Sequence, residues 1–299
     1  MAALVPSLEL VLAEAATLAD ESLNALLPKP QGPEARLLEA MRYAALGGGK
    51  RLRAFLLIQS GGLFGVDRRA LGRAAAAVEC VHAYSLVHDD LPAMDDDDMR
   101  RGKPTVHKAF DEATAILAGD ALLTLAFGLL ASPETHGDPF VRCELVSRLA
   151  LAAGHGGMVG GQMMDIALEG TEPELPQVTR LQRMKTAALF TYCCEAGAIL
   201  GKASQPMRAA LANYGNEVGL AFQIADDILD AEGDAALMGK AAGKDAAHGK
   251  TTVVAALGVE RARIQALAMS RQAVRHLDLF DEKADLLRAA AGFVVARRA

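Results

Sequence analysis

Tryptophan is absent from this 299-residue sequence, and aromatic residues make up only 4% of it. Sheets are rich in aromatic and β-branched residues, so this shortage argues against a β-sandwich or a barrel, whereas abundant alanine and leucine favour helices. With 52% hydrophobic and 23% charged residues, the composition excludes disorder and collagen. No linker rich in proline or serine divides the chain, so we predict one domain that spans residues 1–299.

Cysteine is also scarce, and none of the four cysteines forms a C-x-x-C pair, which argues against a disulfide framework and a zinc site. A net charge of −6 argues against a protein that binds the nucleic-acid backbone. The first residues lack a basic leader, and the most apolar stretch, 113–131, is interrupted by Asp120. We therefore expect no membrane span and a cytoplasmic protein. The cysteines, expected as small hydrophobic residues of a reducing cytosol, are Cys80, Cys143, Cys193 and Cys194.

Apolar residues recur at helical spacing almost throughout, and no run of β-branched residues predicts a sheet. Proline and glycine indicate where the helices end. The segment 91–104 and the glycine-rich segment 233–249 are predicted to be loops. We therefore predict an all-α protein built as a single helical bundle. The expected helices cover about 7–27, 33–47, 51–62, 68–90, 107–131, 138–168, 176–201, 206–231, 249–257, 259–277 and 281–296.

The first acidic motif contains six aspartates within ten residues, from Asp89 to Asp98. A solvated acidic loop is the ordinary explanation of such a charge run. However, Asp89 and Asp90 follow an apolar helix, and the C-terminus of a helix disfavours anions. A hard divalent cation would relieve both this cost and the mutual repulsion of the carboxylates. The motif therefore predicts a metal site.

The second acidic motif is F-Q-I-A-D-D-I-L-D, which ends at Asp230. Asp226 and Asp230 are four residues apart and share one helix face, with Asp227 one step round and Gln223 on roughly the same side. The apolar residues between them leave little room for a broad polar stripe. If the two motifs meet across a bundle core, they form a site of oxygen ligands, which suits Mg²⁺ better than zinc.

A metal held only by carboxylates usually has a phosphate as its other partner, and the sequence supplies cations for one. In G-G-G-K-R-L-R, glycines precede Lys50 and Arg53 at a helix start, which suits an oxyanion, although a basic surface turn is an equal explanation. His82 lies almost two helical turns before Asp89 and shares its face. The remaining candidates are Arg100 and Arg101 after the acidic loop, Lys185 and Thr186 within an apolar helix, and Lys240, Lys244 and Lys250 in or beside the glycine-rich loop.

In order along the chain, the motifs G-G-G-K-R-L-R, D-D-L-P-A-M-D, R-R-G-K-P-T, K-T and F-Q-x-x-D-D-I-L-D resemble those of the trans-isoprenyl diphosphate synthases. More narrowly, the chain resembles bacterial-type farnesyl diphosphate synthases over about residues 35–258. One departure is Ala54, which stands where the family has a proline. The resemblance implies an all-α bundle around a deep central cavity, usually a homodimer. It also implies a reaction in which an allylic diphosphate ionises, the cation alkylates isopentenyl diphosphate, and a proton leaves.

The same resemblance implies a role for each candidate residue. The metal would be Mg²⁺, three ions with substrate bound, with Mn²⁺ as a substitute. The departing diphosphate itself would take the proton, so the protein needs no general base. Thr186 and Gln223 would also offer oxygen dipoles to the carbocation. Metal ligands would be Asp89, Asp90, Asp95, Asp226, Asp227 and Asp230; the allylic diphosphate would contact Arg100, Lys185, Gln223 and Lys240; isopentenyl diphosphate would contact Lys50, Arg53, His82 and Arg101.

The length of the product is predicted from the residues before Asp89. Ser85 lies four residues before it on nearly the same face, and Tyr84 lies about 7.5 Å before it along the helix. A ring at this position, with the long loop between aspartates, resembles enzymes that stop at fifteen carbons. Tyr84 could instead pack only in the core.

Other functions stay open. A geranylgeranyl diphosphate synthase would carry the same motifs. A terpene cyclase of the same fold usually has a different second motif and lacks the basic turn. An acidic metal-binding module without activity would not need Lys185. A non-catalytic partner subunit would have lost an aspartate motif, whereas both are intact here.

Overall fold

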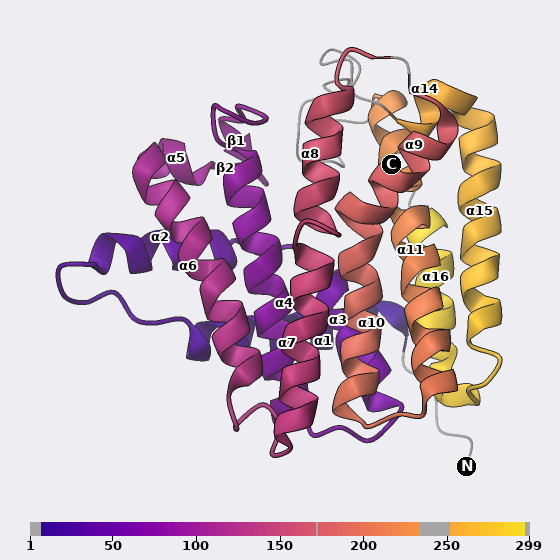
Figure 1. Ribbon diagram of the computed structural model, residues 1–299, viewed down its shortest axis with the longest axis horizontal. Coiled ribbons are helices and arrows are strands. Elements are labelled where there is room, and N and C mark those ends of the chain that lie inside the picture. Colours follow the sequence, from indigo (N-terminus) through magenta and orange to yellow (C-terminus); the bar gives the residue numbers. More distant parts are fainter. Residues whose placement is uncertain (1–6, 172, 234–251, 297–299) are drawn as a thin grey trace. The chain divides into compact units, whose positions relative to one another are not determined.

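The structure is a computed structural model of the chain, and it describes residues 7–171, 173–233 and 252–296. The regular secondary structure of the described residues is almost entirely helical, which confirms the predicted all-α class (Figure 1). They form two compact units, one of Met1–Ile58 with Val66–Val146 and one of Gln59–Gly65 with Ser147–Ala299. The single domain and the central cavity stay predictions.

In the first unit, α4 (Arg68–Asp89) is the buried central helix, and it packs against α1, α2 and α6. Asp67 caps its start by accepting hydrogen bonds from the backbone N–H groups of Arg69 and Ala70. Its alanine-rich middle has no exposed surface, because small side chains let neighbouring helices approach closely. The other elements of this unit are α1 (Leu8–Leu26), α2 (Ala35–Ala45), the start of α3 (Leu52–Gly62), β1 (Met99–Arg100), β2 (Lys103–Pro104), α5 (Val106–Ala109), α6 (Glu112–Ala131) and the start of α7 (Pro139–Ala153).

In the second unit, α11 (Gln205–Ala231) is the longest helix and contacts α10, α14, α15 and α16. The hydroxyl of Tyr214, in its buried middle, donates a 2.6 Å hydrogen bond to the carbonyl of Leu287. This long buried helix carries the second acidic motif at its C-terminal end. The other elements are α8 (Met158–Leu168), α9 (Leu175–Gln182), the π-helical turn η1 (Arg183–Ala187), α10 (Ala188–Leu200), α14 (Val253–Leu257), α15 (Val259–His276), η2 (Glu282–Ala284) and α16 (Asp285–Ala296).

Several predicted boundaries were wrong. The helix expected over 107–131 ends at Ala109, and a new helix starts after Asp111, whose carboxylate accepts a 2.7 Å hydrogen bond from the backbone N–H of Thr114. The helix expected over 138–168 is interrupted at 154–157, where glycines at 154, 156 and 157 favour a turn. Cys143 is exposed, unlike the other three cysteines.

The prediction of no sheet was also wrong in one place. β1 and β2 form a two-stranded antiparallel ladder inside the segment expected to be a loop. The two residues between the strands, Arg101 and Gly102, both have positive φ, of 51° and 74°. Two central residues with positive φ are what a tight two-residue hairpin turn requires.

Helix α6 covers the stretch that we found most apolar in the sequence. Among the described residues it is the one helix that could cross a membrane by length and composition, with 39% of its most apolar window buried. It packs against α2, α4 and α5. Because the core helix of a soluble protein meets the same criterion, this is weak evidence for a membrane span.

Candidate active site

The first aspartate motif lies where α4 ends. Asp89 is the last residue of the helix, and Asp90 is its C-cap. The chain then folds back, because the backbone N–H of Asp95 donates to the carbonyl of Asp89 at 2.8 Å and that of Asp97 donates to the carbonyl of Asp90 at 3.2 Å. The aspartates of the first motif are therefore brought together around the end of α4. Their donors are all carboxylate oxygens, which suit a hard divalent cation.

Arg100 holds the second aspartate of this motif. Its Nε lies 2.7 and 2.9 Å from the two carboxylate oxygens of Asp90, and its Nη2 lies 2.5 Å from one of them. Asp90 and Asp97 are buried, and the Arg100 guanidinium lies 3.7 Å from the Asp97 carboxylate as well. Both Asp90 oxygens accept hydrogen bonds from Arg100. A metal ion bound by Asp90 would therefore use a lone pair that these hydrogen bonds leave available.

The second aspartate motif lies on the last turns of α11, where Asp227 and Asp230 are buried. Asp227 accepts a 2.8 Å hydrogen bond at each oxygen, one from the amide of Gln182 and one from the amide of Gln223. Gln223 in turn accepts a 2.7 Å hydrogen bond from the hydroxyl of Thr186. The chain of contacts therefore fixes a carboxylate in one orientation, as the partners around metal-ligand carboxylates do.

Lys185 and Thr186 lie in η1, a single turn of π-helix between α9 and α10. Such turns interrupt α-helices mainly at functional sites. The ammonium of Lys185 lies 2.5 Å from the carboxylate of Asp165 on α8, and both side chains are largely buried. Lys185 is thus paired within the protein, which explains how a lone lysine is tolerated in an apolar helix.

Two glycines let neighbouring helices approach η1. A Cβ atom at Gly161 on α8 would collide with the backbone of Lys185. A Cβ atom at Gly219 on α11 would lie 2.6 Å from Cα of Ala187. The close packing of η1 against α8 and α11 therefore depends on the missing side chains at these two positions.

The basic turn before α3 lies beside α4. The Nη1 atom of Arg53 lies 3.4 Å from Nε2 of His82, and the guanidinium of Arg101 donates to the carbonyl of Gly48. Lys50 is exposed on the same turn. Burial, and then the charges of Arg53 and Arg101, hold the pKa of His82 well below its ordinary value. Two of the predicted diphosphate-binding residues, Arg53 and Arg101, therefore lie near a neutral imidazole.

One basic residue of this turn has a structural role. Arg51 is buried, and its guanidinium lies 2.9 Å from Glu79, 2.9 Å from Asp20 and 2.7 Å from the carbonyl of Ala45. Its φ of 46° is in the left-handed region, which these contacts hold in place. Arg51 therefore anchors the turn that presents Lys50 and Arg53.

Tyr84 is buried on α4, and its ring packs edge-on against His88 with centroids 5.6 Å apart. Burial, with the charge of Asp89 adding to it, raises the pKa of its hydroxyl to about 12, so the ring carries no charge at neutral pH. The hydroxyl of Ser85 donates to the carbonyl of His82 at 2.9 Å. Tyr84 is thus a bulky, neutral group five residues before the first aspartate.

Sequence reasoning missed two polar partners, Gln182 and Asp165. Asp165 carried a usable signal, because it is a lone acid in the apolar helix M-V-G-G-Q-M-M-D-I-A-L, just as Lys185 is a lone base in its own helix. Gln182 carried none. Lys240, Lys244 and Lys250 lie outside the described residues.

These features define an all-α protein whose helices carry two aspartate motifs, a basic turn and a lysine in a π-helical turn. Comparison with known proteins extends this description. The model of the polyprenyl synthetase family matches residues 34–286. The farnesyl diphosphate synthase of Escherichia coli is 46% identical over 268 residues, which are 87% of this chain and 89% of that protein.

Two further relatives have names that include products other than farnesyl diphosphate. Geranylgeranyl pyrophosphate synthase 11 of Arabidopsis thaliana, a chloroplastic protein, is 43% identical over 87% of this chain and 74% of its own. The crystal structure of a FPP/GFPP synthase from Zymomonas mobilis, in its apo form, has 49% identity and a TM-score of 0.88, covering 97% of this chain and 99% of that chain.

The chain therefore belongs to the polyprenyl synthetase family. It is a prenyltransferase, which confirms the predicted enzyme class and removes the acidic module without activity from the alternatives. The family depends on metal ions, and the carboxylates of the first aspartate motif fit this dependence.

Proposed function

We propose that the chain is a farnesyl diphosphate synthase, which joins isopentenyl diphosphate head-to-tail to dimethylallyl diphosphate and then to geranyl diphosphate. The observation that carries this proposal is the identity of 40–46% to farnesyl diphosphate synthases from four bacteria, over 87–91% of the chain. Both aspartate motifs are intact in the sequence. We further propose that the enzyme is a cytoplasmic homodimer.

We propose that both aspartate motifs bind Mg²⁺ together with the allylic diphosphate, three ions in all, with Mn²⁺ as a substitute. When bound, these ions supply positive charge that neutralises the diphosphate as it departs. Gln182 and Gln223 would keep the Asp227 carboxylate turned in the direction that ligation requires. The proposed ligands are Asp89, Asp90, Asp95, Asp226, Asp227 and Asp230.

The polar residues around these motifs would bind and orient the allylic substrate. Lys185 is held by Asp165, so it would offer the diphosphate an ammonium whose position is already fixed. Arg100 is fixed in the same way by Asp90. The oxygens of Thr186 and Gln223 would face the carbocation with their dipoles. We also include Lys240 and Lys250 among the residues that bind substrate.

Isopentenyl diphosphate would bind at the basic turn, through Lys50 and Arg53 of that turn and through Arg101, which contacts Gly48 from the hairpin between β1 and β2. His82 is neutral at pH 7, so it can donate one hydrogen bond without adding charge beside the guanidinium groups. No protein base is assigned, because the departing diphosphate takes the proton. This site would need no metal.

Product analysis tests the proposal directly. The purified chain is incubated with labelled isopentenyl diphosphate, Mg²⁺ and each short allylic diphosphate in turn, and the products are separated by chain length. We expect a fifteen-carbon product from both dimethylallyl and geranyl diphosphate, and none from Asp89→Asn. No condensation with any allylic partner would overturn the proposal.

A geranylgeranyl diphosphate synthase is the second candidate, favoured by the relative from Arabidopsis thaliana at 43% identity. The two functions differ in how far the chain grows. The buried ring of Tyr84, five residues before Asp89, supports the shorter product. A twenty-carbon main product in the same assay would favour the second candidate.

A further inference from the structure

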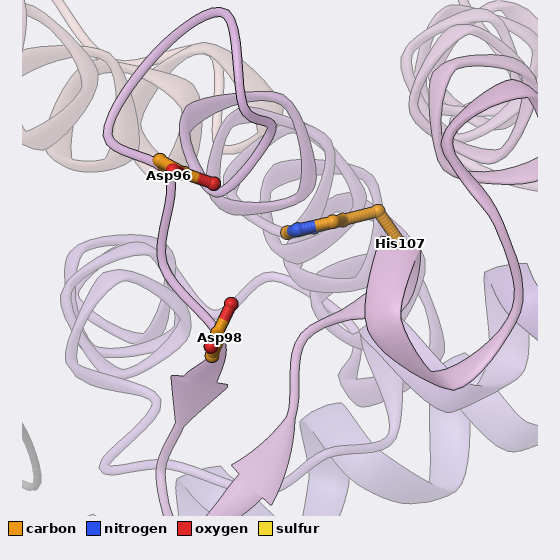
Figure 2. A group of neighbouring side chains, drawn as sticks. All are labelled: Asp96, Asp98 and His107. Atoms are coloured by element: carbon orange, nitrogen blue, oxygen red, sulfur yellow. The ribbon is translucent and has the colours of Figure 1, made fainter.

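We propose that Asp96, Asp98 and His107 form a site for a divalent transition-metal ion such as Zn²⁺, separate from the ligands proposed for Mg²⁺. One possible ligand atom from each residue lies within 4.8 Å of the other two. Figure 2 shows the imidazole extending from α5 toward the loop that carries the two aspartates, with their carboxylates turned to the same space. The proposal does not depend on the condensation reaction.

The imidazole supplies the independent evidence for a ligand. His107 is only 7% exposed, and its Nε2 atom is buried without a hydrogen-bond partner. A buried polar atom without a partner destabilises the fold, so the structure would gain from a group that binds there. Aspartates on a surface are common, whereas a buried imidazole nitrogen left unsatisfied beside them is rare.

The hydrogen bonds around His107 select the form of the ring that binds metals. The hydroxyl of Thr105 donates to the carbonyl of Asp98 at 3.3 Å, which uses its single hydrogen. The contact of 3.2 Å between this hydroxyl and Nδ1 of His107 is then donated by the imidazole. An imidazole that donates from Nδ1 can offer the lone pair of Nε2 to a metal ion. This is the arrangement by which proteins orient a histidine ligand.

The two aspartates differ in how they are held. Asp98 lies 2.9 Å from the ammonium of Lys108 through one oxygen, so a cation there would share this carboxylate with the lysine. Asp96 is exposed and has a left-handed φ of 48°. Ligands of a tetrahedral zinc ion are roughly 3.4 Å apart, because each bond is about 2.0–2.2 Å. The exposed side chains must therefore close on the ion by rotation.

The ligand set determines the class of metal. One imidazole nitrogen with two carboxylates suits zinc and other first-row transition metals, whereas carboxylates alone suit Mg²⁺. The set lies next to Asp95 in the chain but shares no residue with the ligands proposed for Mg²⁺. An ion at this site would connect the loop that carries Asp96 and Asp98 to the start of α5.

Zinc titration in the presence of millimolar Mg²⁺ tests the proposal, with calorimetry as the measurement. We expect about one Zn²⁺ per chain, and an affinity at least tenfold lower in Asp96→Asn and in His107→Gln. Asp96 is exposed, and asparagine has the same shape as aspartate and tolerates a left-handed φ, so Asp96→Asn should fold. Thr105→Val should also weaken binding by about 10–100-fold, because it removes the partner of Nδ1.

Two controls separate this site from others. His155→Gln removes an exposed histidine and should leave zinc affinity unchanged. Asp89→Asn should abolish condensation yet keep the zinc site, so failure of the proposed function and failure of this site are distinguishable. Lys108→Met should raise the affinity, because the competing ammonium is gone. No bound zinc in the unmodified chain, or equal affinity in Asp96→Asn, would overturn the proposal.

Discussion

Replacing Gln182 by methionine tests the network that orients Asp227. Methionine has nearly the same length and volume, so the main change is the loss of the 2.8 Å hydrogen bond to a carboxylate that is only 5% exposed. A hydrogen bond to a charged group contributes about 1.5–3 kcal/mol. In a chain of this size, each kcal/mol corresponds to about 2 °C in the melting temperature, so we expect a decrease of roughly 3–6 °C.

The same substitution should change the metal dependence of the reaction. With one of its two amide partners gone, the Asp227 carboxylate can rotate, and residues that orient metal ligands typically contribute about 10–100-fold in metal affinity or activity. We therefore expect a higher Mg²⁺ concentration for half-maximal condensation. The measurement is the initial rate across a Mg²⁺ series, at saturating substrates.

Gln205→Met is the matched control, because it makes the same chemical change at an exposed position at the start of α11. It should leave both the melting temperature and the Mg²⁺ dependence unchanged. If Gln182→Met behaved like this control in both measurements, our explanation of how Asp227 is held would be wrong.

Three further predictions concern packing, pH and product length. Gly219→Ala should lower the free energy of unfolding by about 1–3 kcal/mol, because its Cβ would press on the backbone of Ala187. Gly128→Ala, at an exposed position of α6, should instead raise it by up to about 1 kcal/mol. Equal effects of the two substitutions in urea unfolding would contradict the packing account. The pKa of His82 in the folded chain is below the ordinary 6.5, so the unfolded chain binds a proton first as the pH falls. The free energy of unfolding should therefore decrease below about pH 6.5, and His82→Gln should make this decrease less steep. An equally steep decrease in His82→Gln would count against a neutral His82. Tyr84→Ala should lengthen the product beyond fifteen carbons while Tyr84→Phe should not, and identical chromatograms for both would remove the ring from this role.

The sequence predicted those parts of the fold that depend on local pattern. The helix expected over 68–90 is α4 (Arg68–Asp89), and the one expected over 206–231 is α11 (Gln205–Ala231), because proline and apolar periodicity indicate their extent. Breaks within long apolar stretches were missed. At 154–157 the periodicity continues on both sides of the glycines, so hydrophobic spacing alone gives no sign of an interruption.

The partners of the site residues were harder to predict than the residues themselves. Clustered carboxylates identify Asp89 and Asp227 because their mutual repulsion needs an explanation. Gln182, in contrast, is an ordinary helix residue until the fold brings it within 2.8 Å of Asp227. The π-helical turn that contains Lys185 packs against α8 and α11, and no local pattern in the sequence predicted it.

The central claim is that both aspartate motifs act on one diphosphate through shared metal ions, and binding linkage tests it most directly. The affinity for an allylic thiolodiphosphate, which resists ionisation, is measured by calorimetry with and without saturating Mg²⁺. Metal and diphosphate that share a site must raise each other's affinity by the same factor. We predict a gain of at least about tenfold in the unmodified chain and its loss in both Asp89→Asn and Asp226→Asn. Full retention of the gain in either variant would contradict the account.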